Sequence, residues 1–296
     1  MREPMRPSPT NPTAVMGRSC PIQRRACCSS LLNQMTWLSL ERDGTRLAAY
    51  DYGGRGTEVV LLLHGLAGHA REWDDTAAWL TASKRVIALD QRGHGRSERQ
   101  PSDMSRDAFV SDVVAWMDRL TLDKAVLVGQ SLGGHTAFLT AARHPSLVAG
   151  LIVAEASPQS DPTSIEVVRN WLGAWPIPFS GRDEAVEYFG GKSLWADAWV
   201  DGLEQREGGL FPAFEIERLI DALSEAEKRP YWDEWSHVEC RTLVIRAERG
   251  LDIGIAKRMA SKSNAQLVTL TEAGHDVHLE QPDAWRNALS SFLRSD

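Results

Sequence analysis

The feature that most constrains the fold of this 296-residue chain is the stretch AVLVGQSLGGH at residues 125–135. An apolar run leads into Ser131, which has one glycine two positions before it and another two positions after it. A sharp turn from a strand into a helix brings the two backbone segments so close that side chains at those flanking positions would collide, and glycine relieves this. We therefore predict a strand over 125–129, a helix that begins at about Leu132, and a turn that presents the serine hydroxyl above the sheet edge.

This turn is suited to a nucleophile. The free N–H groups at the start of the helix, and the positive end of its dipole, point at the same place as the hydroxyl. An anion that forms beside Ser131 would be stabilised there. A G-x-S-x-G motif alone is only moderately specific, but the apolar strand before it and the helix after it, which stops before Pro145, make the signal strong. We interpret Ser131 as a nucleophile; a structural turn with an idle serine is the alternative.

Short apolar segments alternate with helical patterns along most of the chain. The candidate strands are 46–50, 58–63, 85–89, 125–129, 151–155, 242–246 and 266–270. Most of them are almost continuously apolar, which is typical of a parallel sheet covered on both faces. The alternation predicts an α/β fold with a doubly wound, mostly parallel sheet. Ligands of such sheets bind outside the carboxyl ends of the strands, and Ser131 lies at one of those ends.

The alternation breaks between residues 159 and 236. This segment holds six of the 11 tryptophans, and it has 16 Asp or Glu against 7 Lys or Arg. We predict that 159–236 is an inserted, mainly helical and acidic cap on a core formed by 35–158 and 237–296. Its tryptophans either pack the cap onto the core or line an apolar substrate cavity beneath it, and the two interpretations are compatible.

Composition excludes several classes of function. The formal net charge is −7 and no concentrated basic run occurs, so we do not expect nucleic-acid binding. No apolar run reaches the roughly 18 residues that a transmembrane helix needs. Three of the four cysteines lie in the first 28 residues, which disfavours a disulfide scaffold and favours a cytoplasmic location. Residues 1–34 lack an apolar period and are predicted to be a disordered extension, with a natural start at Met35 as the alternative.

A serine nucleophile needs a base whose pKa is near neutral, and histidine is the natural choice. The stretch EAGHDVHLEQP places His275 in a loop between the strand at 266–270 and a final helix. The small residues before it leave room for an imidazole to reach across the sheet edge. We predict His275 as the base. We expect His278, three residues further on, to be structural rather than a metal ligand paired with His275.

Four segments together carry a family resemblance: LLLHGLAGHAREW, IALDQRGHGRS, VLVGQSLGGH and EAGHDVHLEQP. Over about residues 36–296 the sequence resembles the α/β-hydrolase family. The resemblance implies an eight-stranded, mostly parallel sheet with a cap inserted after the sixth strand, which is where 159–236 falls. It also implies an oxyanion hole formed by the backbone N–H groups of Leu66 and Leu132. His64 and His94 are then expected to organise loops rather than to catalyse.

The third member of the implied triad, the acid, departs from the family pattern. The family's usual aspartate follows the strand at 242–246, but this chain reads IRAERGLDIG, with Gly250 at that position, Asp252 two residues late and Glu248 nearer the strand. The family also uses an acid at the end of the preceding strand, where LIVAEASP provides Glu155. Burying a carboxylate there would be costly unless it were paired, and a histidine N–H would pair it. We predict Glu155 as the acid, with Asp252 as its rival; Glu248, or no acid, stays open.

These residues imply a reaction. His275 would take the proton from Ser131, whose oxygen would attack an ester carbonyl; water would then release the acid, and no metal or organic cofactor would be needed. A serine at 131 argues against haloalkane dehalogenase and epoxide hydrolase chemistry, for which the family uses aspartate. We predict a serine hydrolase of small carboxylic esters or lactones. The alternatives are a C–C bond hydrolase or lyase with the same Ser–His pair, and a non-catalytic ligand-binding relative.

Overall fold

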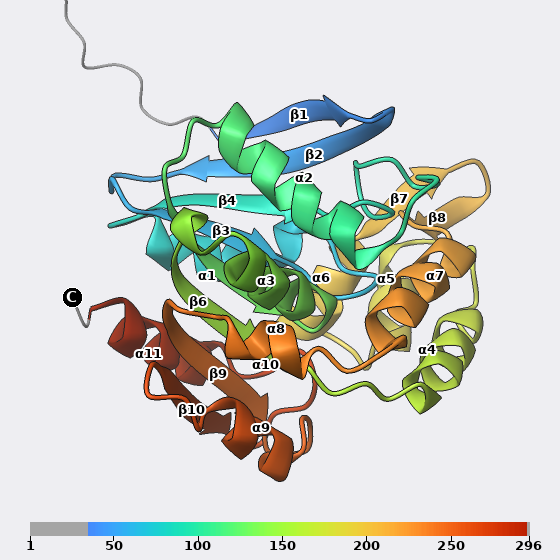
Figure 1. The fold of residues 1–296 in the computed structure, drawn as a ribbon. Helices are drawn as coiled ribbons and strands as arrows, with labels where there is room; N and C mark the ends of the chain where they lie inside the picture. The colour runs from blue at the N-terminus through green and yellow to red at the C-terminus, as the bar shows by residue number, and fades with distance from the viewer. Residues whose placement is uncertain (1–34, 295–296) are drawn as a thin grey trace, which may run out of the picture. The chain divides into compact units, whose positions relative to one another are not determined.

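One eight-stranded sheet organises the protein, for which a computed structural model describes residues 35–294 (Figure 1). The predicted extension, residues 1–34, lies outside the described residues. The strand order is β1-β2-β4-β3-β5-β6-β9-β10. The strands are β1 (Thr36–Arg42), β2 (Thr45–Gly53), β3 (Val59–Leu63), β4 (Arg85–Asp90), β5 (Ala125–Gln130), β6 (Val148–Ala154), β9 (Arg241–Ala247) and β10 (Ala265–Leu270). The β1–β2 and β2–β4 pairs are antiparallel and the other pairs are parallel, which confirms the predicted fold class.

Helices cover both faces of the sheet, because successive strand residues point to opposite sides. In β3, Leu61 and Leu63 belong to one buried cluster, and Val60 and Leu62 belong to the other. The first cluster includes side chains from α2 (Arg106–Arg119), α3 (Leu132–Arg143), α8 (Trp232–Ser236) and α9 (Ile253–Met259). The second includes side chains from the 3-10 helix η1 (Ala70–Trp73), α1 (Asp74–Leu80) and α11 (Pro282–Leu293). Near-continuous apolar strands are the sequence signature of this double coverage.

The segment between β6 and β9 contains five α-helices and a hairpin. In chain order it holds α4 (Thr163–Gly173), α5 (Arg182–Tyr188), α6 (Leu194–Asp201), β7 (Leu203–Arg206), β8 (Gly209–Pro212), α7 (Ile216–Glu227) and α8. We call residues 159–236 the insert. A buried cluster around Trp175, Phe179 and Phe189 joins its helices to Ala67, which lies in the loop after β3. The insert therefore packs on a loop at the carboxyl edge of the sheet.

Two elements differ from the strands expected from the sequence. β1 was not among the candidate strands, because it lies at the sheet edge and its residues are only partly buried, so its apolar signal is weak. The insert, where no strand was expected, contains the antiparallel pair β7–β8. Each of these strands has 4 residues, too few to establish a period in the sequence.

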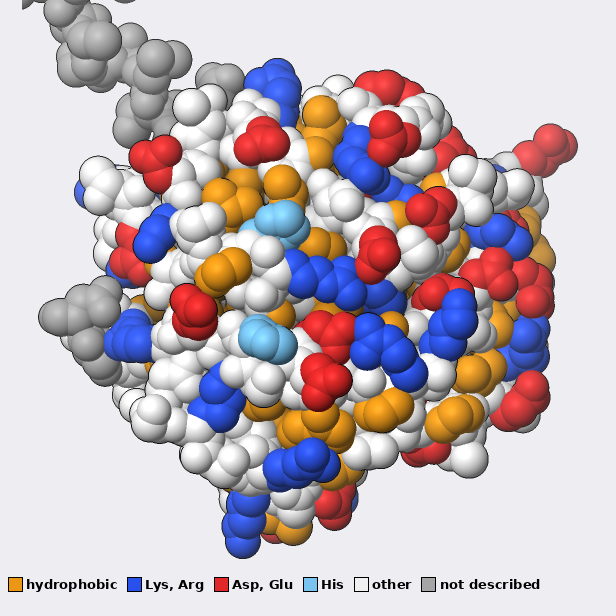
Figure 2. Space-filling model, in the orientation of Figure 1, with side chains coloured by type: hydrophobic (Ala, Val, Ile, Leu, Met, Phe, Trp, Pro, Cys, Tyr) orange, Lys and Arg blue, Asp and Glu red, His pale blue; other side chains and the backbone are white. Residues whose placement is uncertain are grey.

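The surface carries both signs of charge. On the face shown in Figure 2, Lys and Arg side chains are interspersed with Asp and Glu side chains rather than gathered in one basic patch. Among the described residues, no helix combines the length and the apolar character that crossing a membrane requires.

Candidate active site

Ser131 stands on a strained turn between β5 and α3. Its backbone angles are φ 51° and ψ −119°, an uncommon conformation for any residue other than glycine. A Cβ atom on Gly129 would lie 2.3 Å from the carbonyl oxygen of Gly133, and one on Gly133 would lie 2.1 Å from that of Leu63. The N–H of Ser131 donates to the carbonyl of Ala154 in β6 at 2.8 Å. Glycine is therefore required on both sides of the serine, and the sheet holds the turn in place.

The loop that carries His275 lies between β10 and α10 (Val277–Glu280). Its backbone is fixed on both sides of the imidazole, since the carboxylate of Glu280 accepts hydrogen bonds from the N–H groups of Gly274 (2.7 Å) and Asp276 (2.9 Å). The buried amide of Gln130, the residue before the serine, donates to the carbonyl of His275 at 2.9 Å. This bond joins segments 145 positions apart and brings the histidine loop to the turn after β5.

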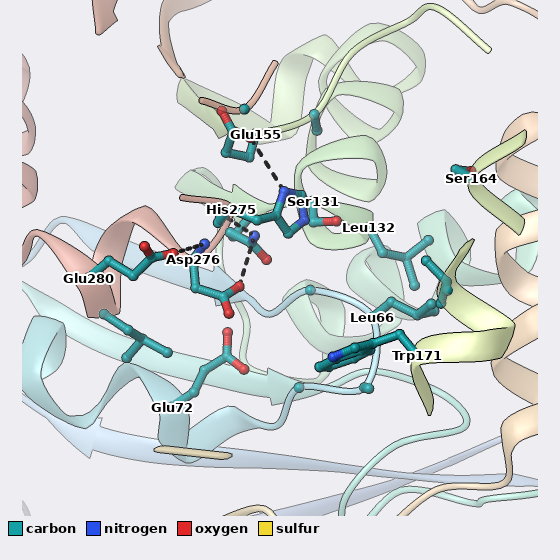
Figure 3. A pocket seen from close by; sticks show the side chains of 18 of the residues that line it. Leu66, Glu72, Ser131, Leu132, Glu155, Ser164, Trp171, His275, Asp276 and Glu280 are labelled. Carbon is teal, nitrogen blue, oxygen red and sulfur yellow. Dashed lines mark hydrogen bonds and ion pairs between the residues drawn. The ribbon is translucent and has the colours of Figure 1, made fainter. Parts of the chain in front are cut away.

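Glu155 follows β6 directly, and its carboxylate faces His275 (Figure 3). The Oε2 atom of Glu155 lies 3.3 Å from Nδ1 of His275, and only 2% of the glutamate side chain is exposed. Backbone N–H groups complete its hydrogen bonding: Ala247 donates to Oε1 at 2.6 Å and Leu251 donates at 3.1 Å. The carboxylate is thus buried with its partners, as the cost of an unpaired buried charge requires.

The two rival acids lie elsewhere. Asp252 is exposed and caps α9, because its carboxylate accepts the N–H of Ile255 at 2.9 Å. Glu248 is also exposed, and its carboxylate accepts the N–H of Glu272 at 3.2 Å. Within residues 35–294, neither carboxylate has a hydrogen bond or ion pair with His275.

Gly250 leaves room for the carboxylate of Glu155, the residue that follows β6. A Cβ atom on Gly250 would lie only 2.0 Å from Oε2 of Glu155. The glutamate carboxylate therefore occupies the space that a side chain at 250 would need. The acid at 155 can occupy this position only because residue 250 is a glycine.

Burial and charge act on His275 in opposite directions. Burial disfavours the imidazolium, but the hydrogen bond to Glu155 and the negative charges of Asp276, Glu155 and Glu280 outweigh it, so the pKa of His275 is raised above its ordinary value. The histidine side chain is nevertheless 57% exposed, because its ring borders the open cavity described below.

Leu66 and Leu132 line the same cavity as Ser131. Among the described residues, neither the N–H of Leu66 nor that of Leu132 donates a hydrogen bond to the protein. Leu132 is the first residue of α3, where helix N–H groups lack intrahelical partners. The loop of Leu66 is held by His64, whose Nε2 accepts from the N–H of Gln91 at 3.0 Å and whose carbonyl accepts from the Gln91 side chain at 2.6 Å.

A cavity of about 1090 Å³ joins these groups. Its wall includes Ser131, His275, Glu155, Leu66 and Leu132, and three insert tryptophans, Trp171, Trp195 and Trp199. Seven carboxyl side chains also line it: Glu72, Glu155, Asp161, Glu227, Glu272, Asp276 and Glu280. Burial raises the pKa of Glu72 to about 8, so this carboxyl is largely neutral at pH 7. Arg249 is the one Lys or Arg among the described residues of this wall.

Sequence reasoning missed part of this wall. Asp276 directly follows His275, and its carboxylate accepts the indole N–H of Trp195 at 2.7 Å and that of Trp199 at 3.3 Å. The adjacency to His275 was a usable signal, whereas nothing in the sequence placed Glu72 in the cavity. His278 is buried against Trp73, their rings 4.2 Å apart, and it lies outside the cavity wall. Within residues 35–294, no group of three or more His, Cys, Asp or Glu side chains could hold a metal ion.

Comparison with known proteins agrees with this architecture. The profile of the α/β hydrolase fold matches residues 58–282. The chain belongs to the α/β-hydrolase family. A relative from Caulobacter segnis, described as a candidate carbamate hydrolase, is 37% identical over 268 residues, which are 85% of this chain and 97% of the relative.

Solved structures of α/β hydrolases superpose on most of the chain. A crystal structure of E-2-(acetamidomethylene)succinate hydrolase has a TM-score of 0.80 at 19% identity and covers 88% of this chain and 100% of its own. The enol-lactonase of Burkholderia xenovorans has a TM-score of 0.70 at 20% identity and covers 86% and 99%. At these identities the likeness concerns the fold that this α/β hydrolase shares with them.

Proposed function

We propose that the protein is a serine hydrolase that cleaves small, uncharged carboxylic esters or lactones through an acyl-serine intermediate. One observation carries the proposal: Ser131 and the hydrogen-bonded pair His275–Glu155 border the same cavity. Figure 3 draws the side chains of Ser131 and His275 on the same part of the cavity wall. Membership in the α/β-hydrolase family supports hydrolysis as the reaction class.

The proposed reaction has two halves. Nε2 of His275 accepts the proton of Ser131 as its oxygen attacks the carbonyl carbon, and the N–H groups of Leu66 and Leu132 bind the oxyanion. The imidazolium then gives this proton to the leaving alkoxide, and the acyl group stays on the serine. His275 next takes a proton from water, which attacks the acyl carbon. The imidazolium then returns this proton to the oxygen of Ser131 as the acyl–serine bond breaks and the carboxylic acid leaves. Glu155 holds Nδ1 as the donor and stabilises the imidazolium throughout.

The proposal is tested with p-nitrophenyl esters from acetate to decanoate and with a fluorophosphonate. Turnover of an ester, together with one phosphonate adduct mapped to Ser131 by mass spectrometry, is the expected result. The chain-length optimum would measure how much of the cavity the acyl group fills. No turnover by folded protein of any ester or lactone would contradict the proposal and favour a C–C bond hydrolase, a lyase or a ligand-binding protein.

We expect kcat/KM to fall at acid pH through the titration of His275. The base must be neutral to accept a proton, and its pKa is raised, so activity is present above this pKa and is lost as the pH falls through it. The acid limb is therefore expected above the ordinary value of about 6.5 for histidine. A pH–rate profile on a neutral ester measures it. An acid limb well below 6 would contradict the assignment of His275 as the base.

The cavity wall supports an uncharged substrate. Carboxyl groups far outnumber the single Arg249 on this wall, and like charges in a partly enclosed cleft repel a substrate anion. We expect kcat/KM for p-nitrophenyl hexanoate to exceed that for mono-p-nitrophenyl adipate, which has the same chain length and a terminal carboxylate, by roughly 10-fold or more. Added salt should narrow the gap, because salt screens exposed charges.

Equal or faster turnover of the adipate monoester would contradict this expectation. Such a result would favour a substrate related to that of the 2-(acetamidomethylene)succinate hydrolase, whose name specifies a succinate, a dicarboxylate. The matched control is the rate of the two esters in buffer alone, because it corrects for their intrinsic reactivity.

A further inference from the structure

The carboxylate of Asp276 connects the insert to the segments on both sides of the proposed active site. Its Oδ2 atom accepts hydrogen bonds from the indole N–H groups of Trp195 and Trp199, both on α6. Its Oδ1 atom accepts a hydrogen bond from the side-chain amide of Gln130 at 3.3 Å, and the same amide donates to the carbonyl of His275. One carboxylate thus links α6, the histidine loop and the residue before Ser131 (Figure 3 shows Asp276 beside His275).

Two tryptophans of α6 are placed to donate hydrogen bonds to Asp276. Trp195 and Trp199 are four residues apart and so project from the same face of the helix. A partly buried indole N–H needs an acceptor, and a carboxylate at 2.7 Å provides a strong, charge-assisted bond. A second bond steadies the helix over the cavity, since Nε2 of His69 lies 2.8 Å from the carbonyl oxygen of Ala198.

We propose that Asp276 is a positioning residue that makes the placement of His275 depend on the seating of α6 over the cavity. The proposal rests on the proposed roles of Ser131 and His275. Closure of the insert on a bound substrate and alignment of the base then become one event, because this carboxylate accepts hydrogen bonds from α6 and from the Gln130 amide that holds the His275 carbonyl. A displacement of about 1 Å in a catalytic group can cost roughly 100-fold in rate, so such a coupling affects turnover strongly.

Asp276 also contributes charge to a crowded electrostatic environment. Besides Asp276, the carboxylates of Glu155 after β6 and Glu280 of α10 raise the pKa of His275. The same cavity wall also carries Glu272 in the loop after β10, Glu72 of η1, which is largely neutral at pH 7, and the cation Arg249. Asp276 is one of the groups that raise the pKa of His275. Removing its charge therefore lowers that pKa and moves the acid limb of kcat/KM to lower pH, an effect that a purely structural residue would not have.

Two substitutions separate position from charge. Asp276→Asn retains the shape, but its NH2 group must face either an indole N–H or the Gln130 amide, both of which are donors. We expect roughly a 10- to 100-fold loss in kcat, with the acid limb at lower pH. Trp195→Phe keeps an aromatic ring, although a smaller one, and removes the indole N–H donor. We expect roughly a 2- to 10-fold loss in kcat, with the acid limb unchanged because the charge of Asp276 remains.

The matched control is Trp171→Phe, because Trp171 lines the same cavity and contacts Trp199, but among the described residues its indole N–H has no acceptor. Double-mutant cycles compare the activation free energies derived from kcat. The double variant Asp276→Asn with Trp195→Phe should raise the barrier by less than the two single variants together. The double variant Asp276→Asn with Trp171→Phe should raise it by the sum of the two single effects. Additivity in both cycles would overturn the proposed coupling. Circular dichroism and thermal unfolding establish that each variant is folded, and Trp195→Phe decides the point if Asp276→Asn is not.

NMR titration of the His275 ring makes the test independent of substrate. Asp276→Asn should lower the titration midpoint, and Trp195→Phe should shift the ring resonances of His275 while Trp171→Phe leaves them in place. A wild-type protein that turns over no ester but shows these NMR effects would contradict the proposed function and support the role of Asp276. An unchanged titration in Asp276→Asn, with normal ester turnover by the wild type, would overturn the role of Asp276 alone.

Discussion

Replacing Ser131 with alanine is expected to reduce ester turnover by roughly 10⁴- to 10⁶-fold, to the level that binding and oxyanion stabilisation alone provide. The substitution removes the hydroxyl that we propose forms the acyl intermediate, while the glycines at 129 and 133 keep the turn open. We expect a change of no more than about 1 kcal/mol in the free energy of unfolding, because the substitution removes a single hydroxyl group. Steady-state kinetics on the best p-nitrophenyl ester and urea unfolding measure the two effects.

Ser164→Ala is the matched control for this experiment. Ser164 lines the same cavity from α4, but it stands on an ordinary helix and not on a strained turn. We expect this variant to hydrolyse the ester at a rate close to that of the wild type and to form the phosphonate adduct. Substantial turnover by Ser131→Ala would rule out an acyl-serine route. An equal loss in both variants would indicate damage to the cavity rather than removal of a nucleophile.

Much of the core could be predicted from the sequence, because its signals are local. Strands buried on both faces are continuously apolar, and the glycine at 129 reflects a collision between the end of β5 and the start of α3, which are adjacent in the chain. β1 escaped prediction because an edge strand with one solvated side has little apolar signal. The hairpin β7–β8 escaped because two 4-residue strands around a glycine turn are too short to show a period.

The site was less predictable where it depends on distant contacts. The elbow and the loop at His275 have their own motifs, and the structure brings them together through Gln130. Three carboxylates were candidates to face His275: Glu155, Glu248 and Asp252. Which of them does so depends on the paths of three separate segments, which follow β6, β9 and β10. The acidic wall of the cavity is likewise assembled from four or more segments, so its residues share no pattern along the chain.

Glu155→Gln is expected to reduce kcat by roughly 10³- to 10⁴-fold while leaving the fold intact. The glutamine is close in size, but its NH2 group must face His275 or one of the backbone N–H groups of Ala247 and Leu251, all of which donate to the present carboxylate. The imidazole then loses its favoured tautomer and the charge that stabilises its protonated form. Leaving those buried donors poorly matched should also cost about 1–3 kcal/mol in the free energy of unfolding.

Asp252→Asn is the matched control, since it removes the same charge from the rival acid. Asn caps helices about as well as Asp, so α9 keeps its cap and the free energy of unfolding changes little. Because Asp252 contacts the start of α9 and not His275, kcat should stay near the wild-type value. The opposite ranking, with Asp252→Asn inactive and Glu155→Gln active, would show that the loop after β9 rearranges to supply the acid.

The close approach between Gly250 and Glu155 allows a stricter test. A side chain at 250 would collide with the carboxylate, since the Cβ position lies 2.0 Å from Oε2, so Gly250→Asp alone should lower both kcat and the free energy of unfolding. In a Glu155→Ala background the same substitution places a carboxylate in the vacated space beside Nδ1 of His275, and we expect it to raise kcat by roughly 10-fold over the Glu155→Ala variant. A change of sign between the two backgrounds would identify this space, rather than a particular chain position, as what the imidazole requires. A substitution that is harmful in both backgrounds would mean that an aspartate at 250 cannot reach the imidazole.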